Sequence, residues 1–449
     1  MNPSTLKFKR QETGQIMLLL AISLVVLLAF VALAIDGGMI YNHRRTDQNG
    51  ADASALAGGG AAARYLETHN TTYNEFSCSK TSVLAAMQSA QAATIQRAAT
   101  SNYTLDTDLS DNNGVNVICR EEDKGISIDK YIDVKVKITT DVQTSFAHLI
   151  FSGPVRNTVE ATVRVHPRAP SANGYAVVSL STYCSGPSGA EIKPTDGGLF
   201  INGNADIEVH NGGMFSYSCF DSGGTSPDVS VIPPEKGIHF KGDIDISGHP
   251  SITPWPDHTT SSLDPIKIPL PRCTGAAHQN VNSGGTIDPG NYDHIKVTNG
   301  ELVLNPGLYC MYGDFDIGGS VRVSDAYPAE AGVTIYLISG DFKVAGNAYA
   351  NLKAPKNDSY APAIRGVVIY MDPANHGQVS MLGNTGSEYT GTVYVPSGLI
   401  EVGGTSGVNP TYRTQLLGYA IKLHGDLDLN IYFEDPDQYS RPAYLDMHK

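Results

Sequence analysis

The chain has 449 residues, including 46 glycines and 25 prolines, and only 17% of its residues are charged. This length allows two or three domains with a large core, and the turn-rich composition is more typical of an extracellular β protein than of a helical enzyme. Acidic residues outnumber lysine and arginine by 45 to 31, a formal net charge of -14, which argues against a basic face for nucleic acid. We therefore expect no nucleic-acid partner.

An apolar stretch near the N-terminus, Ile16–Ile35, contains no charged residue. Twenty residues of helix reach about 30 Å, the thickness of the hydrocarbon core of a bilayer. The stretch is longer than the apolar region of a secretory signal, and Ala32-Leu33-Ala34 is only a weak cleavage match, so a retained anchor is favoured over a removed signal. A buried core helix is disfavoured because Ser23 is its only polar residue. The predicted anchor residues are Ile16, Leu20, Leu24, Leu28 and Ile35.

The six cysteines all follow this stretch, without a C-x-x-C motif or a Cys/His metal spacing. This pattern favours disulfides in an oxidising compartment, so we expect the C-terminal bulk outside the cytoplasm, although free buried thiols remain an alternative. Basic residues lie on both sides of the anchor and do not decide its orientation. Of the 15 possible connectivities, nearest-neighbour pairing would join Cys78 with Cys119, Cys184 with Cys219, and Cys273 with Cys310.

An alanine-rich segment follows the anchor and is expected to continue its helix. The ordered set formed by Gly14, the apolar stretch, Asp36-x-Gly38, Tyr41, Arg44-Arg45, Gln48-Asn49 and Ala51-Asp52-Ala53-x-Ala55-Leu56-Ala57 resembles the N-terminus of TadG-like (TadE/TadG) proteins of the Flp, or tight-adherence, pilus-assembly system. The resemblance implies a membrane-anchored, envelope-exposed pilus-assembly or minor pilin-like component. Its family motif residues here are Gly14, Asp36, Gly38, Tyr41, Gln48, Asp52 and Leu56.

One position departs from the pattern of the related pilins. The pilins carry a glutamate five residues into the mature helix, whereas a cut after Gly14 would put Leu19 at that position. We therefore expect no cleavage there, and a mature N-terminus upstream of Gln15.

A second helix is predicted over Lys80–Ala99, followed by a strand over Ile132–Ile138 in which apolar and charged residues alternate. The block Thr144–Gly153 and the next strand, through Val163, resemble the end of the first domain of TadE- and TadG-like proteins. These features predict an N-terminal tail, anchor and helical extension over residues 1–60, and a small α+β pilin-like domain over residues 61–168. His148 is expected to be structural, because a lone histidine in an apolar segment is rarely a site residue.

Residues 169–449 show almost no helical periodicity. Short alternating segments separated by glycine or asparagine, as in Leu302–Val323, favour an all-β domain that is a right-handed parallel β-helix, or solenoid. A β-sandwich is the alternative.

The pairs Asp314/Asp316 and Asp243/Asp245 could serve glycoside hydrolysis or bind a cation such as Ca²⁺. The Gly-Asp pattern recurs, however, as turn residues do, and no P-loop, H-E-x-x-H, G-x-S-x-G or EF-hand motif is present. We predict no catalytic residue, no metal site, no cofactor and no enzymatic activity.

Together these features predict an α+β N-terminal part with a transmembrane helix, followed by the all-β domain. The expected protein is a single-pass structural component of Flp/Tad-type pilus assembly or surface adhesion in the cell membrane, with its bulk extracytoplasmic. Its expected partners are the membrane and other pilus-assembly proteins, with surface glycans as a further candidate. The alternative is a surface-anchored carbohydrate-active β-helix enzyme or a glycan-binding module.

Overall fold

The computed structural model describes residues 13–69, 71–109, 113–123, 128–147, 153–184, 193, 196–275, 278–345, 347–382, 384, 386–404, 410–425 and 428–448. The chain forms two compact units, one of residues 1–168 with 442–449 and one of residues 169–441. In chain order, the second unit is therefore an insertion near the end of the first. Residues 442–449 were expected in the β domain, but they belong to the first unit because their strand completes its sheet.

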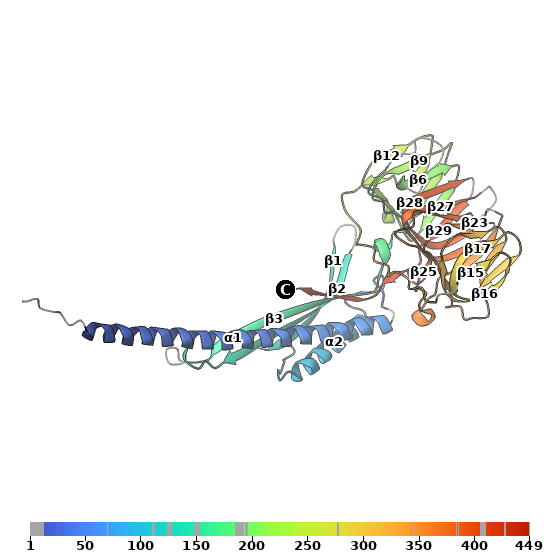
Figure 1. The fold of residues 1–449 in the computed structure, drawn as a ribbon. Helices are drawn as coiled ribbons and strands as arrows, with labels where there is room; N and C mark the ends of the chain where they lie inside the picture. The colour runs from blue at the N-terminus through green and yellow to red at the C-terminus, as the bar shows by residue number, and fades with distance from the viewer. Residues whose placement is uncertain are drawn as a thin grey trace, which may run out of the picture. The chain divides into compact units, whose positions relative to one another are not determined.

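The first unit is built on one long helix, α1 (Thr13–Thr68), whose 56 residues span about 84 Å. The helix is continuous through Gly37 and Gly38 and through residue 60, where a domain boundary was expected. Helix α2 (Thr81–Ala99) packs against its second half (Figure 1). The approach is close, because a Cβ atom on Gly58 would lie 2.0 Å from the hydroxyl oxygen of Thr94.

An antiparallel sheet packs on the same helix, with strand order β1-β2-β3-β31. Its alternation buries every second side chain of β2, including Val134 and Val136, against the helices. The predicted alternating strand Ile132–Ile138 lies within β2. The strands are β1 (Gly114–Asp123), β2 (Ile128–Val142), β3 (Val155–His166) and β31 (Tyr444–His448).

The second unit is all-β, so the prediction of a helical N-terminal part followed by an all-β region is confirmed. Apart from the short antiparallel pair β4 (Ala169–Pro170) with β30 (Ser440–Arg441), its strands pair in parallel and form three rows. Most strands pair with the strand three positions later in the chain. Three long or bent strands contribute to more than one row: β17 (Gly290–Val297), β27 (Glu388–Gly404) and β28 (Thr411–Gly425).

The other strands of the first row are β14 (Asp257–His258), β11 (Ile238–Phe240), β8 (Met214–Ser216), β5 (Val177–Ser179), β25 (Val367–Met371), β22 (Val333–Leu337), β19 (Gly307–Met311) and β15 (His278–Val281). Those of the second row are β12 (Ile244–Ile246), β9 (Phe220–Gly223), β6 (Gly198–Gly203), β26 (Gln378–Met381), β23 (Phe342–Val344) and β20 (Phe315–Ile317). Those of the third row are β13 (Ser251–Thr253), β10 (Asp228–Ile232), β7 (Asp206–His210), β29 (Asp428–Tyr432), β24 (Tyr349–Lys353), β21 (Ser320–Val323), β18 (Glu301–Leu304) and β16 (Gly285–Ile287).

The chain enters this stack in the middle rather than at an end. From β5 it winds outward to β12, β13 and β14, and after residues 259–277 it resumes at β15 and β16, which pair at the opposite end of the rows. It then winds back to β28 and β29, which pair with β5, β6 and β7. The first parallel strands of this unit, β5 to β7, therefore lie beside its last long strands, β28 and β29.

Residues 259–275, here called the crossing segment, run between the two ends as extended chain. Their buried side chains Leu263 and Ile268 pack on outward-facing residues of the first row, including Phe215 and Tyr370. The amide N–H of Leu263 donates to the Tyr217 hydroxyl over 3.1 Å, and the Tyr439 hydroxyl donates to the Lys267 carbonyl over 3.2 Å. The segment is thus fixed along its length by side chains of the stack.

All three nearest-neighbour cysteine pairs form disulfides: Cys78–Cys119, Cys184–Cys219 and Cys273–Cys310. The first lies in the helical unit, where it joins the chain just before α2 to β1. The other two lie in the β unit, and the third ties the end of the crossing segment to β19. The prediction of disulfide bonding is confirmed.

Candidate functional site: the anchor helix and the carboxylates that fix it

The first part of α1 presents its apolar side chains to the outside. Leu20, Leu24 and Leu28 are 56% to 65% exposed, and Ile35 is 44% exposed. Ile16 and Gly14 also lie in α1. Within the described residues, this is a helix long and apolar enough to cross a membrane, and its most apolar window is not buried by the protein. An exposed apolar surface of this length is unfavourable in water and suits a lipid environment.

Asp36 marks the point at which α1 becomes buried. Its side chain is only 3% exposed, and its carboxylate accepts hydrogen bonds from the backbone N–H groups of Ser145, Phe146 and Ala147, over 2.5 to 3.2 Å. These donors lie in the connection between β2 and β3. Charge-assisted hydrogen bonds are stronger than neutral ones. Asp36 therefore ties this connection to the end of the apolar stretch.

Asp47 is a second buried carboxylate on the same helix. It accepts hydrogen bonds from the Tyr103 hydroxyl at 2.8 Å, the Thr140 hydroxyl at 2.5 Å and the Asn157 side-chain amide at 2.6 Å. Burial and the neighbouring carboxylate raise the pKa of Tyr103 to about 12, so the phenol stays protonated and able to donate at neutral pH. One side chain thus joins α1 to β2, to β3 and to the chain after α2.

Sequence reasoning missed Asp47, although a signal was present. Asp36 and Asp47 are eleven residues apart, about three helical turns, so they share one face of α1. Ala51 and Ala55 continue that face and are fully buried. A carboxylate on the small-residue face of an otherwise apolar stripe indicates a hydrogen-bonded core position.

The family motif residues divide between two faces of α1. Gln48 donates to Asp52 over 2.7 Å and to the Glu160 carbonyl of β3 over 3.1 Å, so these two residues support the packed side together with Asp36. Tyr41, at 72% exposure, and Leu56, at 38%, point away from it. Gly38 is exposed as well, and a Cβ atom there would meet nothing within 4 Å. The motif therefore includes residues that the fold of this unit does not use.

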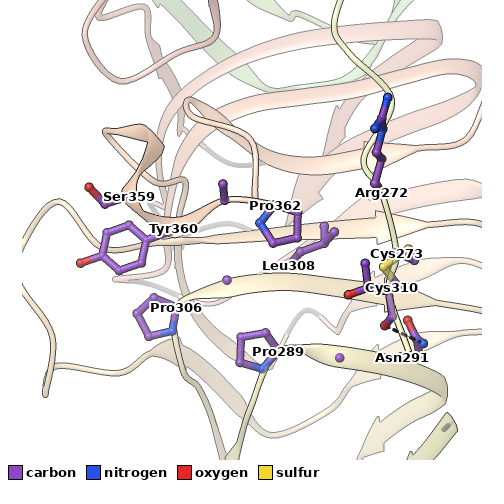
Figure 2. A pocket seen from close by; sticks show the side chains of 14 residues that line it. Arg272, Cys273, Pro289, Asn291, Pro306, Leu308, Cys310, Ser359, Tyr360 and Pro362 are labelled. Atoms are coloured by element: carbon purple, nitrogen blue, oxygen red, sulfur yellow. Dashed lines mark hydrogen bonds between the residues drawn. A yellow bond between two sulfur atoms is a disulfide. The ribbon is translucent and has the colours of Figure 1, made fainter. Parts of the chain in front are cut away.

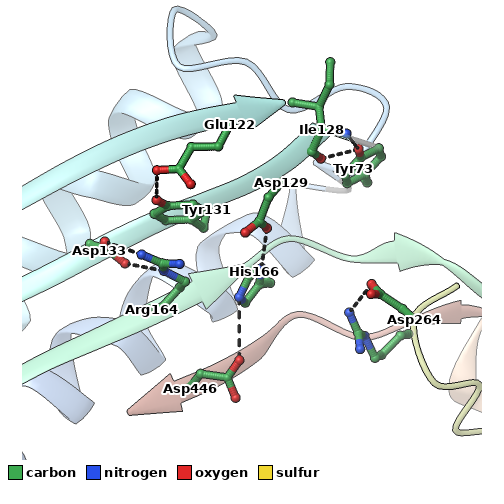
Figure 3. A network of polar contacts seen from close by, with 11 residues as sticks. Tyr73, Glu122, Ile128, Asp129, Tyr131, Asp133, Arg164, His166, Asp264 and Asp446 are labelled. Carbon is green, nitrogen blue, oxygen red and sulfur yellow. Dashed lines mark hydrogen bonds and ion pairs between the residues drawn. The ribbon is translucent and has the colours of Figure 1, made fainter. Parts of the chain in front are cut away.

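A further polar network holds the far end of the sheet (Figure 3). Arg164 of β3 forms a bidentate pair with Asp133 of β2, at 2.8 and 3.0 Å, and its guanidinium lies 3.5 Å from the centre of the Tyr131 ring. His166 lies between Asp129 and Asp446, at 3.5 and 3.6 Å. This network fixes the C-terminal strand β31 in the sheet.

Asp314 and Asp316, one of the two aspartate pairs considered for catalysis, have partners on neighbouring strands of the stack. Asp316 lies in register between Lys296 and Lys343 on neighbouring strands, where opposite charges are mutually stabilising. Asp314 accepts the backbone N–H of Asp341 over 3.0 Å, and Asp341 accepts the backbone N–H of Gln378 over 2.8 Å. Two of the Gly-Asp turns, at Asp314 and Asp341, are thus each tied to the following turn.

The other predicted pair, Asp243 and Asp245, lies at one end of the stack, where Asp245 is in register with Asp221. Among the described residues, no group of three or more histidine, cysteine or acidic side chains is placed to hold a metal ion. His148 lies outside the described residues.

A pocket of about 340 Å³ lies beside the Cys273–Cys310 disulfide (Figure 2). Its wall includes Pro306 and Tyr360, and the Asn291 side chain is held by its amide, which donates to the Gly275 carbonyl over 2.8 Å. The pocket carries no pair of carboxylates among its lining residues, so it lacks the groups that glycoside hydrolysis needs.

Comparison with known proteins identifies the N-terminal segment. Residues 14–63 match the Tad family model, described as Flp pilus-assembly TadE/G-like, which confirms the resemblance over that segment. The match covers the exposed apolar helix, Asp36, Asp47 and the outward-facing Tyr41 and Leu56. No curated protein and no solved structure matches the chain. The chain thus carries a TadE/G-like Flp pilus-assembly segment at residues 14–63.

Proposed function

We propose that this protein is a single-pass, membrane-anchored structural component of Flp-type pilus assembly. The observation that carries the proposal is the continuity of α1. The same helix provides an exposed apolar stretch long enough to span a bilayer and, from Asp36 onward, the buried spine of a folded unit. A force or displacement at the membrane is therefore transmitted to the folded unit through an unbroken helix rather than through a flexible linker.

In this proposal, the outward motif face of α1, defined by Gly38, Tyr41 and Leu56, contacts other pilus-assembly proteins. An exposed tyrosine and an exposed leucine beside a residue without a side chain allow close helix approach. The inward motif residues have structural partners within the unit, whereas these three do not contribute to its core.

The β unit is proposed to lie outside the cytoplasm as a right-handed parallel β-helix that presents a surface. Three disulfides support an oxidising compartment, and parallel pairing of strands three apart supports successive coils. The lysine-flanked position of Asp316 supports a structural rather than an enzymatic role.

The test is deletion of the gene, followed by electron microscopy for pili and an adhesion assay. Loss of pili or adhesion, restored by the native gene, is expected. Restoration should fail with Tyr41→Ala combined with Leu56→Lys, and should succeed with the control Tyr183→Ala, which removes another exposed tyrosine, from the β unit. Unchanged pili and adhesion in the deletion strain would contradict the proposal.

Glycan binding is the second candidate function, favoured by the pocket beside Cys310, where Tyr360 offers a ring for sugar stacking. A glycan array probed with the full chain and with Tyr360→Ala tests it. Replacing Asp314 and Asp316 by asparagine tests the enzyme alternative, because a hydrolase would lose polysaccharide turnover while a structural protein would keep piliation.

A further inference from the structure

The connection between β2 and β3 is held at the point where α1 leaves its apolar stretch. Asp36 directly follows Ile35, the last residue of that stretch, and its carboxylate accepts hydrogen bonds from the backbone N–H groups of residues 145–147. The Ser145 hydroxyl also lies 3.6 Å from the sulfur of Met39, on the next turn of α1. Residues 145–147 therefore lie at the level of the helix where an apolar span of about 30 Å would end.

The strands on either side of this connection run beside α1 toward its apolar end (Figure 1). Eleven residues further along the helix, Asp47 accepts hydrogen bonds from Thr140 of β2 and Asn157 of β3. Eleven residues of helix rise about 16 Å, so the strand pair advances by about that distance between Asp47 and Asp36. The end of this pair thus points toward the apolar end of α1. It is here called the hairpin end and consists of residues 141–147 and 153–156.

The hairpin end exposes apolar side chains at this level. Phe146 is 41% exposed, and Val155, which is in register with the buried Val142, is exposed as well. Single exposed apolar side chains are common on protein surfaces and need no partner. Phe146 differs by its position, because its backbone is hydrogen-bonded to Asp36, and the helix surface beyond that point is the exposed apolar face of α1. A bilayer around that face is therefore the nearest apolar environment that can cover Phe146.

Basic side chains lie near the same level. Arg156, at the start of β3, is exposed, and its Nε lies 3.4 Å from Asp141, in an exposed pair of the kind that contributes little to stability. Arg44 is exposed on α1, about 12 Å beyond Asp36 and about 80° around the helix from it. Side chains of a helix lean toward its N-terminus, and arginine carries its charge on a long apolar stem. Arg44 therefore reaches back toward the apolar stretch.

These cations lie in a chain whose formal net charge is -14. The headgroup region of a bilayer, which contains the lipid phosphates, is about 5 to 7 Å thick on each side of the hydrocarbon core. Arginine binds phosphate through two parallel N–H···O bonds. Two arginines within reach of that layer, together with an exposed phenylalanine at its inner border, provide both the charge and the apolar surface that bind proteins to a membrane interface.

We propose that the hairpin end is a second contact of this protein with the bilayer that α1 spans. Phe146 lies among the upper acyl-chain segments of the leaflet from which α1 emerges, and Arg44 and Arg156 bind lipid phosphates of the same leaflet. The inference rests on the proposed membrane anchor and adds a fixed orientation to it. A single helix leaves its own tilt and rotation open, and interfacial contacts are what set them.

The second contact also determines which face of α1 is available to neighbours in the membrane plane. Gly38 lies about 200° and Tyr41 about 140° around the helix from Asp36. The outward motif face is therefore on the side of α1 away from the hairpin end. A chain held by both contacts presents that face sideways, toward other proteins anchored in the same membrane.

Tryptophan fluorescence in lipid vesicles tests the contact. Trp255, the only native tryptophan, is removed by Trp255→Phe, and Phe146→Trp is introduced into that background. The full chain is reconstituted into vesicles of phosphatidylcholine and phosphatidylglycerol with brominated acyl chains, which quench tryptophan in the hydrocarbon layer. The control is Ile118→Trp in the same background. Ile118 is 37% exposed and lies on β1, in register with Asp133, far along β2 from the hairpin end.

The emission of Phe146→Trp should be quenched several-fold more than that of Ile118→Trp. Val155→Trp, on the other strand of the hairpin end, is an independent reporter and should also be quenched more than the control. If neither reporter exceeds the control, the proposal is wrong. It is also wrong if the emission of Phe146→Trp shifts to shorter wavelength as the ratio of protein to lipid rises, without quenching by bromine, because another protein copy would then cover the residue.

The arginines have their own measurement. With Phe146→Trp as the reporter, quenching should be stronger in vesicles that contain phosphatidylglycerol than in phosphatidylcholine alone, because an anionic surface attracts the arginines. Arg44→Glu combined with Arg156→Glu should abolish this difference. The control, Arg64→Glu combined with Arg97→Glu, makes the same charge change on parts of α1 and α2 further from the apolar stretch and should preserve it. A difference that persists after reversal of Arg44 and Arg156 would contradict their binding to lipid phosphate.

Flotation of the vesicles on a density gradient separates this inference from the anchor on which it rests. A chain that floats with the vesicles, but whose tryptophan at position 146 is quenched no more than the control, would refute the contact of the hairpin end alone. A chain that does not float with the vesicles would refute the membrane anchor itself.

Discussion

The carboxylate of Glu67 accepts a hydrogen bond from the backbone N–H of Ala443, over 2.7 Å and across almost the whole length of the chain. Its other oxygen accepts from Arg168, at 2.6 Å. Arg168 is the last residue before the inserted β unit, and Ala443 is the second residue after that unit. One side chain at the end of α1 therefore holds the chain both where it leaves the first unit and where it returns.

Glu67→Ala is expected to destabilise the attachment of β31 by about 2 to 3 kcal/mol, because it removes a charged acceptor and leaves the mostly buried Arg168 without its carboxylate. Hydrogen exchange should show faster exchange of the β31 amides. Glu75→Ala is the matched control, since it breaks an exposed pair with Lys80, expected to contribute less than about 1 kcal/mol. Equal effects of the two substitutions would contradict this role for Glu67.

Asp36→Ala should lower the stability of the first unit by roughly 2 to 4 kcal/mol, because three backbone N–H groups lose a charged acceptor. Asp36→Asn should lie between this variant and the native chain, since the amide oxygen still accepts but carries no charge. Thermal unfolding of the full chain in detergent measures both. Asp141→Ala, which removes an exposed ion pair with Arg156, is the control. If Asp141→Ala lowers the stability as much as Asp36→Ala does, the burial of Asp36 is not the cause of the loss.

Some elements of this fold can be predicted from the sequence, because their patterns depend only on residues that are close together in the chain. The period-two alternation of Ile132–Ile138 identifies a half-buried strand, and the length of Ile16–Ile35 identifies an exposed apolar helix, because each depends only on neighbouring residues. The motif around Asp36 identified the right segment, although the partners of Asp36 lie more than 100 residues away.

The order in which the strands of the β unit pair could not be predicted from the sequence. Short strands separated by glycine look alike in both halves of the β unit, so nothing local shows that β28 pairs with β5 and β6 or that the chain enters in the middle. The C-terminal strand Tyr444–His448 was misassigned for the same reason, since its partner β3 lies far back in the chain. Long-range pairing is set by which edges remain unpaired, and that is a property of the whole fold.

Gly58→Ala should destabilise the packing of α1 on α2 by about 1 to 3 kcal/mol, even though alanine favours helix over glycine by about 1 kcal/mol. The added methyl group would lie 2.0 Å from the Thr94 hydroxyl oxygen and 2.9 Å from the Ala90 carbonyl oxygen, and backbone cannot move aside as a side-chain end can. Gly60→Ala is the control, because its Cβ atom would meet nothing within 4 Å. It should stabilise the helix slightly. If Gly58→Ala were instead more stable than the native chain, α1 and α2 would be able to move apart at little cost.

The β unit should lose stability as the pH falls from about 4.5 to 2, in part through Glu401. The close contact with the His424 ring nitrogen, at 3.0 Å, and the ion pair with Lys422, at 2.9 Å, lower the pKa of this carboxyl to about 2. A group whose pKa is lowered by folding contributes its stabilisation above the unfolded value and loses it as the pH falls through the folded value. Unfolding by denaturant at several pH values should therefore show a shallower acid loss in Glu401→Gln than in the native chain. The control Glu330→Gln, at an exposed position, should leave the dependence of stability on pH unchanged. If stability fell with pH in parallel for the native chain and Glu401→Gln, Glu401 would not contribute to the acid loss.

Replacing both Cys273 and Cys310 by serine should free the end of the crossing segment while leaving the coils formed. The disulfide closes a loop of 37 residues, and its loss is expected to cost roughly 2 to 4 kcal/mol by increasing the conformational freedom of the unfolded chain. The side-chain contacts at Leu263 and Ile268 remain, so hydrogen exchange should rise most near Cys273 and fall off toward Leu263. The double variant Cys78→Ser with Cys119→Ser is the control, because it opens a loop of similar length in the first unit and should not alter exchange in the crossing segment. If the whole segment exchanged as fast as its end, the tyrosine contacts would not hold it, and the disulfide would be its main attachment to the stack.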